Sequence, residues 1–306
     1  MSQHEPSTRP VTVIGGYLGA GKTTLVNHLL RNANGLRIAV LVNEFGALPI
    51  DADLIEAQDD NIISIAGGCV CCSYGNDLIL AMLDLAKMTP APQHVLLEAS
   101  GVAIPGAIAS SVGLLTGYTL DGVVVLADAE TLRQRADDHY MGDTVRQQLQ
   151  DADILVLNKT DLIEAQQLDE TNNWLASEFS DAKVIETEHA ELPRDVVLGQ
   201  TGSRRALPAQ SELHHGKLFE SHSFTLSGPL DVTRLAQALV QDELGVIRAK
   251  GFAIACDGTP YELQVVGRRW SATAVKAVPY TGIVCIGPAN QLRTDLIAPI
   301  IADAVQ

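Results

Sequence analysis

The chain has 306 residues, of which 46% are hydrophobic and only 4% aromatic, which favours two domains with aliphatic cores and excludes a disordered chain. Its formal net charge of −16 repels phosphates and anionic lipids, so we expect neither nucleic acid nor a membrane as a partner. No apolar run reaches the roughly 18 residues of a membrane helix, and residues 1–10 lack the apolar core of a signal peptide, so we expect a cytoplasmic protein that begins with a disordered tail.

Short apolar segments alternate with helical patterns from residue 11 to residue 193. Continuous runs of Val, Ile and Leu are typical of strands buried on both faces of a parallel sheet. Six such runs are Val11–Gly15, Ile38–Val42, Val95–Glu98, Gly122–Ala127, Ile154–Leu157 and Lys183–Glu186. Helical patterns lie between them at Thr23–Arg31, Asn76–Met88 and Thr144–Leu149. This alternation predicts an α/β domain with a doubly wound, mainly parallel sheet over residues 11–193.

A second, smaller domain is predicted after a polar linker at residues 194–217, which is rich in Gly, Ser and Pro. The pattern over residues 218–306 indicates an α+β domain. Its expected elements are a strand at Phe219–Leu226, a helix at Leu230–Leu244, a hairpin of Ile247–Cys256 with Tyr261–Arg268 across Asp257–Gly258, a strand at Gly282–Ile286 and a helix at Ala289–Val305. Cys256 and Cys285 fall inside apolar strands, so we expect both to pack in the core.

A phosphate-binding loop follows the first predicted strand. The segment Gly16–Thr23 matches the pattern G-x-x-x-x-G-K-[ST] between a strand and a helix. Glycines allow backbone N–H groups to surround phosphates, and the helix directs its positive end at the same charge. Lys22 is expected to reach the β- and γ-phosphates and Thr23 to ligate Mg²⁺. The expected nucleotide contacts are Gly16, Tyr17, Leu18, Gly19, Ala20, Gly21, Lys22, Thr23 and Thr24.

A base-recognition segment ends the fifth predicted strand at Asn158, Lys159 and Asp161. The Asp carboxylate accepts two hydrogen bonds from the ring N–H and the amine of guanine, a donor pair that adenine lacks. Asn158 is expected to bridge loop and base, and the Lys159 stem to lie along the ring. A further backbone N–H, near Thr187, is expected to meet the guanine oxygen. The segment therefore predicts GTP and GDP as ligands in preference to ATP.

Two segments between these motifs are predicted to respond to the γ-phosphate. Glu98 ends a core strand, where a carboxylate holds Mg²⁺ together with Thr23, and Gly101 has the freedom to turn its N–H toward the γ-phosphate. Asp51, in an earlier loop, is a further Mg²⁺ ligand or a solvated loop residue. No Gln follows Gly101, so we expect slow intrinsic hydrolysis that a partner, a dimer or a metal accelerates.

A cluster of cysteines lies between the loop of Asp51 and the strand of Glu98, at Cys69, Cys71 and Cys72, with Glu44 as a further ligand candidate. Two thiolates two residues apart in an extended segment project to the same side. Thiolates suit Zn²⁺, Co²⁺, Ni²⁺ or Cu⁺. The compact set favours a transient metal site, while a disulfide sensor and buried cysteines remain alternatives.

Together, the segments GYLGAGKTTL, NEFG, GGCVCC, EASG and NKTD resemble the CobW family of metal-chaperone P-loop GTPases. The resemblance is dense from Val11 to about Leu162 and extends to LGVIRAKGF in the second domain. It implies a GTPase that binds Zn²⁺ or Co²⁺ at its cysteine motif and delivers it to a client metalloprotein or a cofactor-pathway enzyme. Related GTPases of this class often work as dimers, in a nucleotide- or metal-dependent way.

Two departures from the family pattern limit what carries over. Ala47 stands where relatives often have Glu, which removes one metal ligand, and only His214, His215 and His222 remain of a His-rich tract. High-capacity metal storage is therefore not expected. A redox- or metal-sensing regulatory GTPase without metal transfer is the alternative function.

Overall fold

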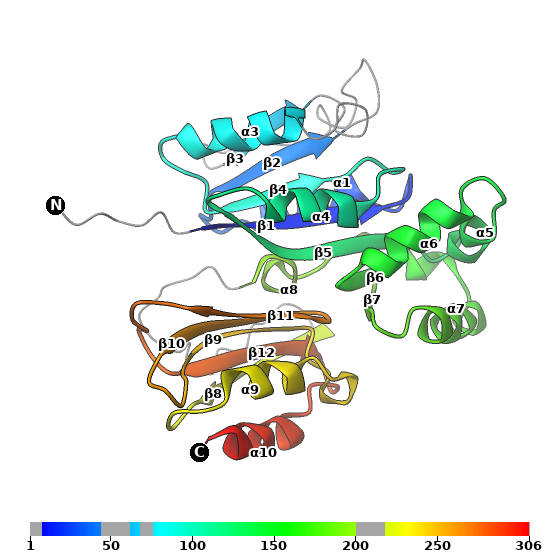
Figure 1. Ribbon diagram of the computed structural model, residues 1–306. Helices are drawn as coiled ribbons and strands as arrows, with labels where there is room; N and C mark the ends of the chain where they lie inside the picture. Colours follow the sequence, from blue (N-terminus) through cyan, green and yellow to red (C-terminus); the bar gives the residue numbers. More distant parts are fainter. Residues whose placement is uncertain (1–7, 44–61, 68–75, 200–217, 306) are drawn as a thin grey trace. The chain divides into compact units, whose positions relative to one another are not determined.

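The computed structural model describes residues 8–43, 62–67, 76–199 and 218–305. Its contacts divide the chain into two compact units, Met1–Leu198 and Gly199–Gln306. Each unit has its own sheet and its own apolar core, coloured in sequence order in Figure 1. No helix in the described ranges has the length and apolar character needed to traverse a bilayer.

A seven-stranded sheet forms the centre of the first unit, in the order β3-β2-β4-β1-β5-β6-β7. All of its strand pairs are parallel. The strands are β1 (Arg9–Gly16), β2 (Ile38–Asn43), β3 (Ile62–Gly67), β4 (His94–Glu98), β5 (Tyr118–Asp128), β6 (Ile154–Asn158) and β7 (Lys183–Thr187). The aliphatic runs produce this sheet because both faces of each central strand are covered.

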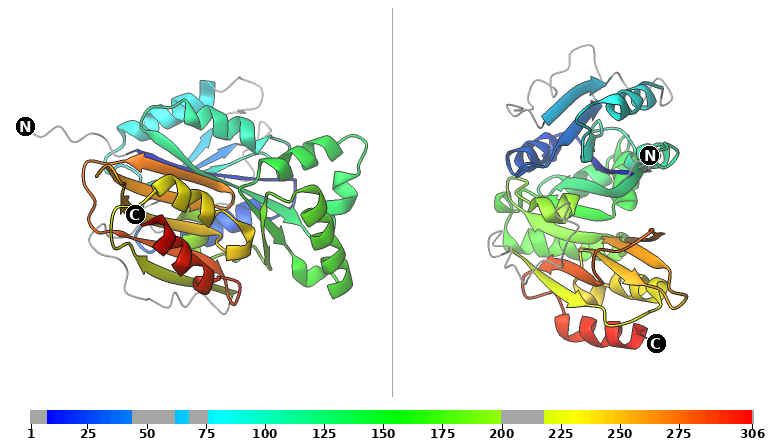
Figure 2. Two further views of the ribbon diagram at one scale, coloured as in Figure 1. Left: turned by 60° about the horizontal axis from the view of Figure 1, so that its bottom comes forward. Right: turned by 90° about the vertical axis from the view of Figure 1, so that its left-hand side faces the viewer.

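Helices cover both faces of this sheet. They are α1 (Lys22–Arg31), α3 (Asn76–Lys87), α4 (Pro105–Gly113), α5 (Leu132–Ala136), α6 (Gly142–Asp151), the 3₁₀ turn η1 (Thr160–Leu162), α7 (Ala165–Glu178) and α8 (Arg194–Leu198). Helices α3, α4, α6 and α7 share one apolar core with alternate residues of the strands, whereas α1 lies on the opposite face (Figure 2). The predicted doubly wound α/β fold is therefore confirmed.

The ends of the first unit differ from the sequence-based boundaries. Strand β1 begins at Arg9, inside the predicted tail, because Arg9 pairs with Tyr118 and its guanidinium lies 5.7 Å from that ring. Helix α8 occupies the start of the predicted linker. Its Arg194 donates to Asp195 and to the Ala33 carbonyl, and residues 195–198 are buried. A short, mostly buried helix thus ends the unit where composition alone indicated a linker.

The second unit is a five-stranded antiparallel sheet in the order β11-β10-β9-β12-β8. Its elements are β8 (Phe219–Thr225), α9 (Val232–Leu239), the 3₁₀ turn η3 (Asp242–Leu244), β9 (Arg248–Ile254), β10 (Pro260–Val266), β11 (Arg269–Ala274), β12 (Gly282–Pro288) and α10 (Thr294–Ala304). Helices α9 and α10 pack on one face of the sheet (Figure 1). The predicted smaller α+β domain is confirmed.

The predicted hairpin and the two cysteines of this unit have different outcomes. Gly258 has φ +85° in the turn between β9 and β10, where Thr259 donates its N–H to Asp257, so the Asp-Gly turn is confirmed. Cys285 is fully buried in the core, as predicted. Cys256 is exposed, and the prediction that it packs in the core is wrong because strand β9 ends at Ile254 and Cys256 already belongs to the turn.

Candidate functional site

The site lies at the carboxyl edge of the parallel sheet. Strands β1, β4 and β6 end at Gly16, Glu98 and Asn158, and the loops that follow them contact one another. Parallel strands that all end at one edge bring distant sequence motifs together, and ligands of open α/β sheets bind outside these ends.

The phosphate loop needs its glycines for conformation and for space. Gly16, Gly19 and Gly21 have φ values of +128°, +79° and +104°, a region that side chains with a Cβ rarely adopt. A Cβ on Gly16 would lie 2.2 Å from the Leu126 carbonyl oxygen, and one on Gly21 would lie 2.5 Å from the Asn158 amide nitrogen. The loop is therefore held close to β5 and to the base-recognition segment.

Helix α1 begins at Lys22, directly after Gly21, which caps the helix without a side chain. The first N–H groups of a helix have no partner within the helix, and its amino end carries a partial positive charge. Lys22 is a buried residue, and its ammonium donates to the Tyr17 carbonyl at 3.3 Å. A cationic side chain and a helix start thus lie together at this loop, which is the arrangement that binds phosphates.

Thr23 and Glu98 meet across the loop. The Thr23 hydroxyl donates to Glu98 Oε1 at 2.7 Å, and Glu98 is 2% exposed. A hydroxyl and a carboxylate are hard oxygen donors of the kind that Mg²⁺ prefers. These two residues therefore fit a magnesium ion, which would be held between helix α1 and the end of β4.

Gly101 lies against the phosphate loop. A Cβ at this position would be 2.5 Å from Leu18 Cδ2 and 2.9 Å from the Leu18 backbone nitrogen, so only glycine fits there without displacing the loop. The Ala103 N–H donates to the Ser100 carbonyl at 2.9 Å, which makes residues 100–103 a turn. This turn is the segment predicted to respond to the γ-phosphate.

Asn158 joins three segments, and sequence reasoning anticipated only part of this role. Its Nδ2 donates to the Ala20 carbonyl at 2.9 Å, and its Oδ1 accepts the Ala190 N–H at 2.8 Å. The side chain is 2% exposed. It therefore ties the phosphate loop to the loop after β7, where Thr160 donates to the Thr187 carbonyl at 3.3 Å.

Lys159 and Asp161 follow in an unusual backbone. Lys159 has φ +64°, and its ammonium donates to Asp128 Oδ2 at 2.7 Å. Asp161 lies in η1, and its side chain is exposed. Sequence reasoning missed Asp128, although its position directly after the apolar run of β5 is the signal that could have found it. The Asp128 carboxylate holds the Lys159 stem in place beside the exposed Asp161.

A second missed residue is Gln148 in α6. Its amide is 1% exposed and donates to the carbonyl oxygens of Gly101 at 3.1 Å and Ala103 at 2.8 Å. The signal was a polar residue in the apolar stripe of the helix, three residues after Val145 and next to Leu149. A buried polar side chain needs hydrogen-bond partners, and these are the backbone of the turn at 100–103.

Several predicted ligands lie outside the described residues: Glu44, Asp51, Cys69, Cys71, Cys72, His214 and His215. Within the described ranges no group of three or more His, Cys, Asp or Glu side chains is arranged to hold a metal ion. The structure does describe the strands that precede these segments, and β2 and β3 are paired from Ile38–Ile62 to Asn43–Gly67.

Comparison with known proteins identifies both units. Residues 10–186 match the model of the CobW/HypB/UreG nucleotide-binding domain, and residues 219–299 match the cobalamin synthesis protein cobW C-terminal domain. The zinc chaperone CobW of Sinorhizobium sp. is 33% identical, over 85% of this chain and 86% of its own. The zinc chaperone YjiA of Escherichia coli is also 33% identical, over 92% of this chain and 96% of its own.

A solved structure, that of the Zn(II)-bound YjiA GTPase from E. coli, is similar with a TM-score of 0.48 and 24% identity, covering 98% of this chain and all of that one. The family match itself spans more than half of this chain, from β1, before the phosphate loop, into β7. The chain therefore belongs to the CobW/HypB/UreG family of P-loop GTPases and carries the cobW C-terminal domain as its second unit.

Proposed function

We propose that this chain is a GTP-hydrolysing metallochaperone. It binds a transition metal ion, Zn²⁺ foremost and Co²⁺ as the alternative cargo, at Cys69, Cys71 and Cys72 with Glu44. It delivers the ion to a client metalloprotein or an enzyme of a metal-cofactor pathway, and the nucleotide controls the delivery. Support comes from relatives named as zinc chaperones that match this chain over most of both lengths.

GTP is bound and its base is recognised by residues at the carboxyl edge of the sheet. The backbone of Gly16–Thr24 and the Lys22 ammonium bind the phosphates, and Gly101 contacts the γ-phosphate through its N–H. Asn158, Lys159 and Asp161 select guanine. Thr23, Glu98 and Asp51 would hold Mg²⁺, which when bound would supply charge neutralisation at the phosphates. Hydrolysis by the chain alone is slow because Val102, not Gln, follows Gly101.

The observation that carries the coupling is the register of three neighbouring strands. Asn43 pairs with Gly67, and Val42 pairs with Glu98. Neighbouring strands lie about 4.8 Å apart, so the chain leaves the sheet toward Cys69 at roughly 10 Å from Glu98, two strand spacings away. The segment toward Glu44 leaves from the strand between them. A metal at the cysteines and a nucleotide beside Glu98 are therefore near enough to affect a shared backbone.

Linkage makes this proposal testable. If GTP changes the affinity for the metal, the metal must change the affinity for GTP by the same factor. We expect the dissociation constant for Zn²⁺ to differ by at least about tenfold between a non-hydrolysable GTP analogue and GDP. The measurement is competition with a chromophoric chelator, repeated with Co²⁺, whose absorption spectrum reports thiolate ligands directly.

Matched cysteine variants make the test specific. Cys71→Ser removes one proposed ligand, whereas Cys256→Ser removes an exposed thiol in the second unit. We expect Cys71→Ser to weaken Zn²⁺ binding and to abolish the nucleotide dependence, and Cys256→Ser to behave as the unmodified chain. Equal Zn²⁺ affinities in both nucleotide states would refute nucleotide-controlled delivery, and loss of two thiols on mild oxidation would then favour a redox sensor. Sedimentation in each state tests the nucleotide- or metal-dependent homodimer that we propose as the working assembly.

A further inference from the structure

Helix α6 holds the turn that follows Glu98 at several points. Gln148 donates to the carbonyl oxygens of Gly101 and Ala103. One turn later, Asp151 accepts the Gly106 N–H at 2.7 Å, in the first turn of α4. Both ends of the segment from Gly101 to Gly106 are thus bonded to one helix, which lies beside α4 and α5 in Figure 1.

The contact at Gly106 leaves no room for a side chain. A Cβ there would lie 2.5 Å from Asp151 Oδ2. Asp151 is itself held by Gln147, whose amide donates to Oδ1 at 2.9 Å. The start of α4 is therefore fixed against α6 by a short, charge-assisted hydrogen bond, and such bonds are stronger than those between neutral groups.

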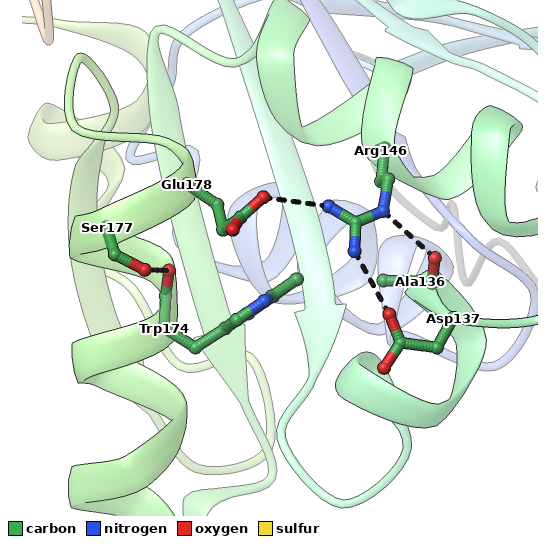
Figure 3. Close-up of polar contacts among 6 residues, drawn as sticks. All are labelled: Ala136, Asp137, Arg146, Trp174, Ser177 and Glu178. Atoms are coloured by element: carbon green, nitrogen blue, oxygen red, sulfur yellow. Dashed lines mark hydrogen bonds and ion pairs between the residues drawn. The ribbon is translucent and has the colours of Figure 1, made fainter.

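The outer side of α6 is anchored as well. Figure 3 shows the Arg146 guanidinium donating to the Ala136 carbonyl, to Asp137 and to Glu178. Its Cζ lies 5.6 Å from the centre of the Trp174 ring. The helix is thereby tied to the end of α5 and to α7, so its inner face offers a fixed support to the turn at 100–103.

The turn at 100–103 lies against the phosphate loop. Gly101 leaves no space for a Cβ beside Leu18, and Gln148 lines one small pocket together with Tyr17, Leu18 and Arg135. The Arg135 guanidinium lies 5.3 Å from the centre of the Tyr17 ring. A movement of the turn at 100–103 must therefore displace either the phosphate loop or the Gln148 amide.

We propose that Gln148 is a positioning residue for GTP hydrolysis, an inference that rests on the proposed GTPase function. By fixing the carbonyl groups on the carboxyl side of Gly101, it limits the rotation of this glycine and keeps its N–H directed to the γ-phosphate. Gln148 does not touch the nucleotide. It acts by preorganising a donor that does, and preorganised donors account for much of the catalysis of phosphoryl transfer.

The test replaces Gln148 by Met, which keeps the length and the burial of the side chain and removes both donor hydrogens. We expect kcat for GTP to fall about tenfold or more, because a misplaced donor costs transition-state stabilisation. GDP affinity should stay within about twofold of the unmodified value, because the loop glycines and Asp161 are untouched. The measurements are single-turnover phosphate release and fluorescent-nucleotide titration. Gln150→Met, at an exposed position of the same helix, is the control.

A second variant guards against simple unfolding. Gly106→Ala displaces Asp151 from the other end of the segment and should lower kcat in the same way while GDP binding persists. If the unmodified chain hydrolyses GTP and Gln148→Met keeps its kcat, the positioning role is refuted. An equal loss of GDP and GTP affinity in both variants also refutes it, since it would indicate a role in the fold alone. If the unmodified chain does not hydrolyse GTP at all, the proposed function itself fails.

Discussion

The two units of the chain have opposite sheet architectures, and the difference explains where the chemistry lies. In the first unit seven parallel strands end at one edge, and Gly16, Glu98 and Asn158 are brought together there. In the second unit neighbouring strands run in opposite directions, so their ends are divided between two edges. A parallel sheet thus concentrates functional loops, whereas this antiparallel sheet distributes its polar residues along the strands.

Polar residues in the two units consequently differ in what they contact. Lys22 lies at a helix start in a loop with three left-handed glycines, and its ammonium reaches a backbone carbonyl. Lys250 lies within strand β9, and its ammonium pairs with Glu262 of β10 at 3.1 Å. The first lysine has the position that we propose for binding an anionic ligand, while the second stabilises a pair of strands.

The largest expected difference between the two units appears when each of these lysines is replaced by Met. We expect Lys22→Met to lower kcat/KM for GTP by about 100-fold or more, because a buried positive charge on the phosphates is lost. Lys250→Met should change it less than about twofold, since a partly exposed ion pair contributes little. Steady-state GTP hydrolysis with saturating Mg²⁺ measures both. Full activity of Lys22→Met would overturn the assignment of the phosphate loop, and a large loss in Lys250→Met would place the second unit in the reaction.

The sequence predicted the part of the fold that rests on continuous aliphatic runs. Each of the six expected strands of the first unit is present, because a run such as Gly122–Ala127 has few environments open to it except a sheet covered on both faces. Strand β3 was missed, since Ser64 interrupts the apolar run of Ile62–Gly67. Helix α7 was missed because only Thr171 and Leu175 of its 14 residues are buried, which leaves almost no apolar period to detect.

The site was predictable where a motif determines the chemistry and not where tertiary contacts do. The phosphate loop and Asn158, Lys159 and Asp161 could be predicted because the spacing of each motif follows from the ligand that it is expected to bind. Asp128 and Gln148 were missed because their partners are distant in sequence, 31 residues for Lys159 and 47 for Gly101. No local pattern records such a pairing. A polar residue inside an apolar stripe is the general signal, and it names the residue but not the partner.

A smaller effect is expected from the buried thiol of the second unit. Burial raises the pKa of Cys285 to about 12. The folded state then keeps a proton that the unfolded state releases above about pH 8.5, the ordinary pKa of a thiol. The contribution of this protonated thiol to the stability of the folded state is fully present below that pH and is lost as pH rises toward 12. We expect the free energy of unfolding to fall by up to roughly 1.4 kcal/mol per pH unit in this window.

The two tryptophans allow this to be measured in one unit, because Trp174 belongs to α7 and Trp270 to β11. In a Trp174→Phe background, urea unfolding followed by Trp270 fluorescence between pH 8 and pH 10.5 reports the second unit. The slope to compare is that of the free energy of unfolding against pH. Cys285→Ala should remove the fall that this thiol causes, whereas Cys256→Ala, at the exposed thiol, should not. Identical slopes for the unmodified chain and Cys285→Ala would contradict the assigned pKa.

The smallest effect compares one arginine from each unit. Arg146 donates to two carboxylates and a carbonyl and lies over Trp174 (Figure 3), and its side chain is 33% exposed. Lysine keeps the charge but not the planar fork of donors. We expect Arg146→Lys to lower the free energy of unfolding of the first unit by about 1 kcal/mol, measured by urea titration with Trp174 fluorescence in a Trp270→Phe background.

The matched residue is Arg293, whose side chain bonds only Asp295, two residues away, among the side-chain contacts described, with both side chains largely exposed. The hydrogen bond and charge of Arg293 hold the pKa of Asp295 below its usual range. Arg293→Lys should leave the unfolding midpoint of the second unit unchanged, and the Asp295 pKa, followed by NMR, should move only toward its ordinary value. If Arg146→Lys also left the unfolding midpoint unchanged, three bonds to the end of α5 and to α7 would add no more than one local pair. Helix α6 would then lack the rigid outer anchor that its hold on the turn at 100–103 requires.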